Sequence, residues 1–232
     1  MLDSTPTLAG EALLWSRVLV TGTEAEAFLQ GQLSQDLASL GEDGAWSLLL
    51  APDSLVIASM HVTRVTGGLS MVVERDLSDV TVGRLRRFLL RTDAQLVVEE
   101  IDRGPFATDL DRIKGQWPAA SEFARQLTPH TFGSSFVRAT ISFTKGCFTG
   151  QELVGRLDAR GSNIPWRFVK VSGDDPQSLD RALCSAGPDG PKGLTSWCIS
   201  DHKVTGLGVV HRSLLTNLES LQSSGISVVA ID

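Results

Sequence analysis

The chain has 232 residues, of which 42% are apolar and 21% charged, and this suits one large or two modest globular domains rather than a disordered or fibrous protein. The formal charge of −6 argues against general attraction to nucleic acid or to an anionic membrane surface, although it does not exclude a local basic groove. The sequence shows neither a long apolar run nor a basic start followed by an apolar stretch, so we expect no membrane span and no secretion signal.

The first hundred residues alternate apolar runs with turn residues. A helix is expected after a capping box of Thr23 and Glu26, and a second helix from Ser78, with basic positions between Arg84 and Arg91. These arginines either grip an anionic ligand or form a solvated face, and the solvated face is the more ordinary outcome. Gly67-Gly68 predicts a hairpin turn. Strands are expected over residues 13–20, 46–50, 55–62, 69–74 and 95–101.

The second half changes character past Gly161. Residues 102–118 are rich in Gly, Pro and charge and are predicted as a connection, which a short helix over 119–126 and a strand over 137–143 follow. Short strands separated by turns predict a small antiparallel barrel or sandwich after a boundary near Pro165. The predicted strands cover residues 168–171, 181–185, 194–199, 206–211 and 226–231.

The segment Lys145-Gly146-Cys147-Phe148-Thr149-Gly150-Gln151-Glu152 carries the clearest chemical signal. Thr149 and Glu152 have capping-box spacing, so a helix is expected from Thr149 to near Gly161. Cys147 then precedes a helix N-terminus, whose partial positive charge favours a thiolate, and Lys145 adds a positive charge. An accessible thiolate can act as a nucleophile, a redox sensor or a soft-metal ligand.

The alternative is that Cys147 is a small buried hydrophobe, and local physics leaves the two readings about even. Cys184 and Cys198 lie in strand-like apolar runs, where burial is the better expectation. The odd, sparse set of three cysteines fits a reducing compartment, so we expect a cytoplasmic protein. His61, His130, His202 and His211 show no metal-ligand spacing, and no metal site is predicted.

The Cys147 segment, followed by Arg156, resembles the signature of the YgfZ family, Lys-Gly-Cys-Tyr-x-Gly-Gln-Glu with a later arginine. The related glycine-cleavage aminomethyltransferases lack its cysteine. Residues 28–37 are similar to the first helix of the family, and residues 84–91 to its basic helix. Residues 112–118 are similar to its Arg-Ile-x-x-Gly-x-Pro segment, and residues 194–196 and 206–211 to parts of its C-terminal barrel.

The resemblance implies an α+β fold, with a GcvT-like N-terminal α/β region over residues 1–165 and a small antiparallel β-barrel over residues 166–232. It implies that Cys147, with Lys145, is the working centre of a protein that supports the assembly or repair of iron–sulfur enzymes. A tetrahydrofolate-like ligand is also implied. The residues that the resemblance places at the ligand are Gln32, Asp36, Gly146, Gln151, Glu152 and Arg156. If residues 32 and 36 share a helix face they can reach one ligand, and a polar surface stripe is the equal alternative.

Three departures separate the chain from the family pattern. Phe148 replaces the tyrosine beside the cysteine, and residues 158–166 lack the usual basic run. Between Ile101 and Arg112 family members carry an additional α/β segment, and its absence weakens the expectation of folate binding.

Two other functions stay open, a folate-dependent aminomethyl or one-carbon transferase and a scaffold that binds only proteins. The expected partners are iron–sulfur enzymes or cluster-assembly proteins and a small-molecule folate, without a membrane and without direct nucleic-acid binding.

Overall fold

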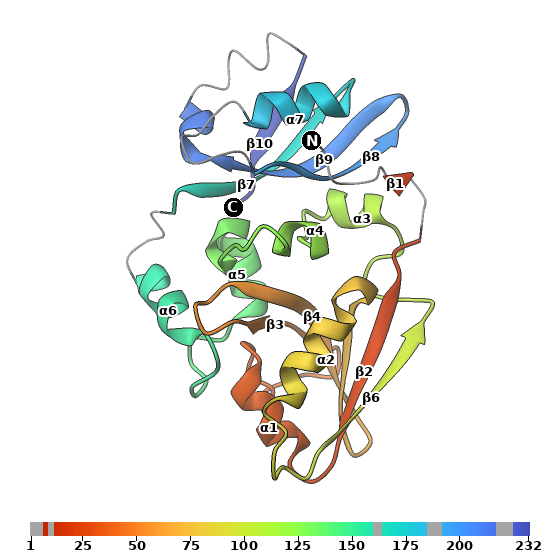
Figure 1. The fold of residues 1–232 in the computed structure, drawn as a ribbon, viewed down its shortest axis with the longest axis vertical. Coiled ribbons are helices and arrows are strands. Elements are labelled where there is room, and N and C mark those ends of the chain that lie inside the picture. Colours follow the sequence, from red (N-terminus) through yellow and green to blue (C-terminus); the bar gives the residue numbers. More distant parts are fainter. Residues whose placement is uncertain (1–6, 9–11, 160–163, 185–191, 217–224) are drawn as a thin grey trace.

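The computed structural model describes residues 7–8, 12–159, 164–184, 192–216 and 225–232. In Figure 1 the sheet built from the first hundred residues lies at the bottom with two helices, the sheet built mainly from the C-terminal strands lies at the top, and short helices fill the layer between them. This α+β architecture confirms the predicted fold class.

The first sheet contains five antiparallel strands in the order β3-β4-β5-β2-β6. Gly67 lies in the turn between β4 and β5 with φ of 79°, as the predicted hairpin requires. The predicted strands of this region are confirmed with small shifts at their ends. Their bounds are β2 (Trp15–Thr21), β3 (Ala45–Leu50), β4 (Val56–Val65), β5 (Gly68–Glu74) and β6 (Gln95–Ile101).

Two helices pack on this sheet, α1 (Ala25–Gln32) and α2 (Ser78–Arg86), and the 3-10 turn η1 (Arg75–Leu77) precedes α2. The predicted capping box of α1 does not form. The Thr23 hydroxyl donates to the Asp93 carboxylate at 2.6 Å, and the Glu26 carboxylate instead accepts from Arg64. Long-range partners thus replace the local bonds that the spacing suggested.

The middle layer contains α3 (Asp109–Lys114), α4 (Ala120–Phe123), η2 (Pro129–Phe132) and α5 (Ser134–Thr140). The predicted connection over 102–118 therefore includes a helix, α3, which a Thr108–Asp111 capping box opens. The strand predicted over 137–143 is wrong, because most of that stretch belongs to α5. Val137 and Thr140 are buried on α5, so packing outweighs the strand propensity of the β-branched residues.

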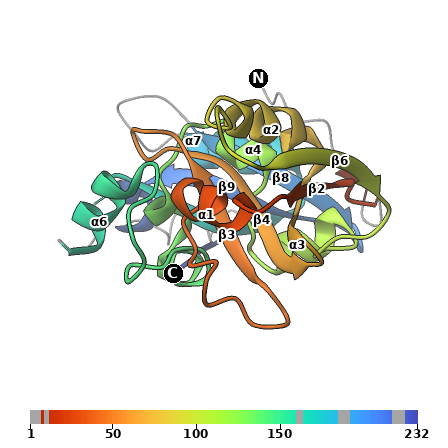
Figure 2. The same cartoon turned by 90° about the horizontal axis from the view of Figure 1, so that it is seen from below.

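Helix α6 (Gln151–Ala159) projects to one side of the molecule, as Figure 2 shows from below. It begins two residues later than predicted, and the end predicted near Gly161 lies outside the described residues.

The second sheet has the order β1-β8-β9-β7-β10, and β1 pairs in parallel with β8. The strand predicted over 181–185 is wrong, because residues 181–184 belong to the helix α7, which buries Leu179 and Leu183 one turn apart; residue 185 lies outside the described residues. Within the described residues the expected barrel takes the form of this five-stranded sheet. Its elements are β1 (Thr7–Leu8), β7 (Trp166–Gly173), α7 (Pro176–Cys184), β8 (Gly193–Ser200), β9 (Lys203–His211), η3 (Arg212–Thr216) and β10 (Ser227–Ala230).

The boundary near Pro165 stays a prediction. Strand β7 starts at Trp166, yet β1 at the other end of the sequence joins the same sheet. One apolar core also connects the two sheets, since Phe168 and Leu207 belong to the same buried apolar cluster as residues of the first sheet and of the middle layer. Within the part of the chain that the structure describes, no helix is both long and apolar enough to cross a membrane.

Candidate functional site around Cys147

Cys147 is exposed to solvent in the loop between α5 and α6. It borders a shallow hollow of about 450 Å3, which Pro52 and residues 147–152 line. The flanking residue Gly146 has open space where a side chain would start. A partner or reagent therefore has access to the sulfur, whereas the buried alternative for this cysteine does not hold.

Lys145 is buried beneath the same loop. Its ammonium donates three hydrogen bonds to main-chain carbonyls, to Gln30 at 2.7 Å, to Leu33 at 2.6 Å and to Gln35 at 2.9 Å. Burial lowers the pKa of Lys145 to about 8, and the nearby Asp36 carboxylate opposes this shift, so the group is protonated at neutral pH. An ammonium has three N–H donors, so these three carbonyls use all of them. This geometry gives Lys145 the role of an anchor for the loop.

The loop is held from two further directions. The Thr149 amide donates to the Gly31 carbonyl at 3.3 Å, and the Ser54 hydroxyl donates to the Gly150 carbonyl at 2.5 Å. Gly150 has φ of 83°, and a Cβ there would lie 2.6 Å from the Ala51 carbonyl oxygen. Only glycine fits this close approach without strain. The exposed thiol therefore sits on an anchored loop.

The start of α6 uses a bond different from the predicted one. The Phe148 amide donates to the Gln151 side-chain oxygen at 3.3 Å, which ties Gln151 into the loop. Glu152 and Arg156 form an ion pair one turn apart on the exposed face of α6. Such an exposed pair contributes little stability. Both charged side chains are exposed to solvent, and both follow Cys147 within ten residues of the chain.

Gln32 and Asp36 do not share the predicted helix face, although both lie near the Cys147 loop. Helix α1 ends at Gln32, so Asp36 lies in the following loop, where its carboxylate accepts from the Gln30 amide at 2.8 Å. This bond lowers the pKa of Asp36. The side-chain oxygen of Gln32 is buried and has no hydrogen-bond partner among the described residues. The main-chain carbonyls of the neighbouring residues Gly31 and Leu33 accept hydrogen bonds from Thr149 and Lys145. The structure therefore places Gln32 and Asp36 at the base of the Cys147 loop.

The other two thiols lie in the C-terminal layer. Cys198 is fully buried in β8, as expected for a core cysteine. Cys184 lies in α7 rather than in a strand, and its thiol donates to the Asp180 carboxylate at 3.6 Å. Burial, together with Asp180, raises the pKa of Cys184 to about 11. Neither thiol has the accessibility of Cys147.

Sequence reasoning missed a buried charged network between the two sheets. Arg112 donates to the Asp109 carboxylate at 2.6 Å and lies 3.3 Å from Glu122, which is fully buried. Glu122 also accepts from the Ser196 hydroxyl of β8 at 2.7 Å. Charges this deeply buried persist only when paired and hydrogen-bonded. The resemblance did mark the Arg112 segment, but the sequence offers no local signal for its partners.

Aromatic side chains gather around the connection that follows β6. Trp46 of β3 lies 4.3 Å from the Trp117 ring and 6.1 Å from the Phe106 ring, measured between centroids. A hollow of about 370 Å3 adjoins Trp46 and has His61 and residues 103–105 on its walls. The shortened connection therefore packs on the sheet and leaves a small, open concavity.

Comparison with known proteins places these features in context. No protein-family model matches the chain. The tRNA-modifying protein YgfZ of Enterobacter sp. (strain 638) is 23% identical over 220 residues, covering 64% of this chain and 67% of that protein. The protein of the same name from Klebsiella pneumoniae (strain 342) is 24% identical with the same coverage.

The fold provides a second line of comparison. The crystal structure of glycine cleavage system aminomethyltransferase T from Bartonella henselae matches with a TM-score of 0.58 at 14% identity. The match covers 88% of this chain and 80% of that one, and it shows likeness of fold. Distant sequence similarity to YgfZ proteins, together with the fold that the chain shares with the aminomethyltransferase, confirms the YgfZ/GcvT-type resemblance predicted from the Cys147 motif.

Proposed function

We propose that this protein acts in the cytoplasm as a YgfZ-like factor that supports the assembly or repair of iron–sulfur enzymes through the thiol of Cys147. The observation that carries this proposal is the exposure of Cys147 on a loop held by the three hydrogen bonds of Lys145. A soft, accessible sulfur on a fixed loop suits transient contact with a metal cluster or with another thiol.

A reduced folate is the small-molecule ligand of this proposal. Similarity to YgfZ proteins and the aminomethyltransferase fold support it. Two features of the chain agree with a flat, polar-edged ligand. The hollow beside Trp46 offers an aromatic wall and the Arg103 side chain, and outside that hollow, at the base of the Cys147 loop, the buried Gln32 oxygen is an unused acceptor among the described residues.

The expected partners are iron–sulfur enzymes or cluster-assembly proteins. The two bacterial relatives carry the name tRNA-modifying protein. With a net charge of −6 this chain has no general attraction to RNA, so a link to tRNA modification would run through a client enzyme. Direct RNA binding would be recognised by a strong dependence of affinity on salt.

The test is complementation in cells that lack the wild-type copy, with the activity of iron–sulfur enzymes as the readout. Cys147→Ser should abolish support, whereas the matched change Cys184→Ser should retain it. Circular dichroism and urea unfolding of both variants establish that they are folded. Full rescue by Cys147→Ser would remove the thiol from the mechanism and favour the one-carbon transferase, whose relatives lack this cysteine.

Folate binding is tested separately by thermal unfolding with tetrahydrofolate. A ligand that binds the folded state stabilises it by about 2.7 kcal/mol at a hundredfold excess over its Kd. If saturating folate leaves Tm unchanged while complementation still needs Cys147, the protein acts without folate.

A further inference from the structure

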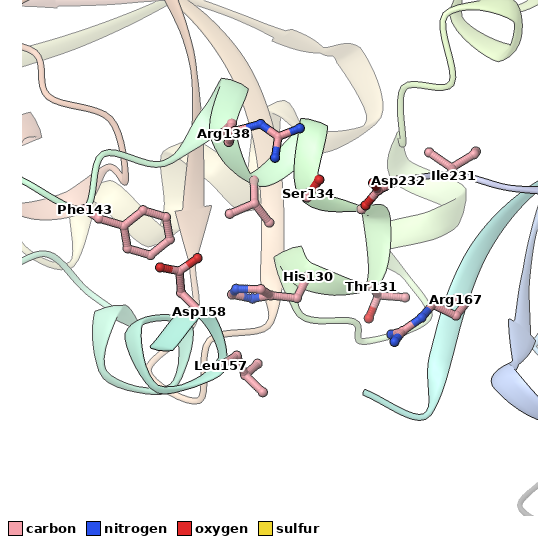
Figure 3. Close-up of a pocket in the computed structure, with 12 residues that line it drawn as sticks. His130, Thr131, Ser134, Arg138, Phe143, Leu157, Asp158, Arg167, Ile231 and Asp232 are labelled. Carbon is pink, nitrogen blue, oxygen red and sulfur yellow. The ribbon is translucent and has the colours of Figure 1, made fainter. Parts of the chain in front are cut away.

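A further pocket, of about 370 Å3, is lined by residues that precede and follow the Cys147 segment in sequence (Figure 3). Its walls come from η2, α5, α6, β7 and the residues after β10, so it lies where the middle layer and α6 meet the second sheet. Apolar side chains form part of its surface, namely Val137, Phe143, Leu157 and Ile231. A concave, partly apolar site of this volume matches the size of a small-molecule ligand.

His130 on η2 is the unusual group of this pocket. Its side chain is buried, and among the described residues neither ring nitrogen has a hydrogen-bond partner. Figure 3 shows the imidazole pointing into the pocket, toward the wall where α6 carries Leu157 and Asp158. A neutral imidazole has one donor and one acceptor, and burying both without partners is unfavourable. A polar occupant that supplies both an acceptor and a donor would satisfy the ring.

Charged residues of both signs line the pocket, namely Arg138, Arg167, Asp158 and Asp232. Arg138 projects from α5 and Asp158 from α6, and within the described ranges neither side chain has an ion-pair partner. The Arg138 guanidinium donates one bond, to the Ser135 hydroxyl at 3.1 Å, and keeps other donors for a ligand. Val137, Phe143 and Leu157 provide the apolar surface alongside these two charges.

We propose that this pocket binds a small zwitterion of the amino-acid class with an apolar side chain. The Arg138 guanidinium receives the carboxylate, the Asp158 carboxylate receives the ammonium, and the apolar walls receive the side chain. The ligand also supplies the donor and the acceptor that His130 lacks. This site is separate from the folate proposal and does not depend on it.

The probe is L-phenylalanine, titrated into the full chain while the histidine ring signals are followed by NMR. The chain has four histidines, and loss of one signal in His130→Gln assigns the ring of interest. We expect saturable shifts of the His130 signals with a Kd of about 1 mM or tighter, as fits a ligand of this size. Arg138→Gln and Asp158→Asn should each weaken binding about tenfold.

Two analogues and two control variants make the result decisive. 3-Phenylpropanoate lacks the ammonium and phenethylamine lacks the carboxylate, so both should bind at least about tenfold more weakly than L-phenylalanine. Arg181→Gln and Asp174→Asn remove the same charges from surfaces outside the pocket and should leave binding unchanged. Absence of binding, equal binding of an analogue, or equal loss in a control variant would each overturn the proposal.

Discussion

Lys145 and Leu33, 112 positions apart in the chain, are joined by a hydrogen bond of 2.6 Å from the ammonium to the main-chain carbonyl. The same ammonium also holds the carbonyls of Gln30 and Gln35. This single side chain therefore makes three of the bonds that fix the Cys147 loop to the C-terminal end of α1 and the residues that follow it, beside the bond from the Thr149 amide to the Gly31 carbonyl.

Replacing Lys145 by methionine should destabilise the protein by about 2–4 kcal/mol, because three partly buried carbonyls lose their donor. The measurement is the midpoint of urea unfolding. Lys114→Met, at an exposed lysine of α3, removes the same charge and should change stability by less than about 0.5 kcal/mol. Equal midpoints for the two variants would contradict the anchoring role.

The three thiols should differ strongly in their rate of alkylation. Cys147 is exposed and should react first, and Cys184 should lag at about pH 8 because its pKa is raised to about 11 by burial and by Asp180. Cys198 is fully buried and should react only when the chain opens. Mass spectrometry of quenched iodoacetamide reactions gives the three rates. If Cys184 or Cys198 reacted as fast as Cys147 in the folded protein, the assignment of Cys147 as the accessible thiol would fail.

Sequence patterns predicted most of the strands because apolar alternation is local information. The helix α7 was missed because residues 181–185, taken alone, resemble a strand, whereas the spacing of Leu179 and Leu183 carries the helical signal. The Cys147 loop was located correctly from its glycines and from the start of a helix. The role of Lys145 could not be predicted, since its three acceptors lie 110 or more positions away. The unpartnered imidazole of His130 likewise depends on packing between distant elements.

Glu74 should make stability depend on pH. Burial raises its pKa from 4.5 to about 7, against the hydrogen bond that its carboxylate accepts from the Ala120 amide. The folded state therefore binds this proton more tightly than the unfolded state. The contribution is fully present below about pH 4.5 and is lost as the pH rises through about 7.

Glu74→Gln keeps the acceptor for Ala120 but removes the ionisation. The variant should be about 1–3 kcal/mol more stable than the wild type at pH 8 and should show no such gain at pH 5. Urea unfolding across this pH range measures the difference. Glu42→Gln, at an exposed position, is the control and should follow the wild type throughout. A Glu74→Gln curve parallel to that of the wild type would show that Glu74 titrates alike in both states.

Replacing each of the two glycines beside Cys147 by alanine should have different effects on stability. At Gly150 the backbone has φ of 83°, and an added Cβ would lie 2.6 Å from the Ala51 carbonyl oxygen and 2.8 Å from the Leu50 Cβ. At Gly146 no atom lies within 4 Å of the added Cβ. Gly150→Ala should therefore cost about 1–3 kcal/mol, whereas Gly146→Ala should stay within about 0.5 kcal/mol of the wild type.

The same pair tests whether the loop must be fixed for the thiol to work. Strain at Gly150 loosens the bond between its carbonyl and the Ser54 hydroxyl, which holds the loop beside Pro52. Gly150→Ala should then retain fast alkylation of Cys147 but lose support of iron–sulfur enzymes, while Gly146→Ala retains both. If Gly150→Ala is folded, is less stable and still gives full support, exposure of the sulfur is sufficient and the anchoring of the loop serves stability alone.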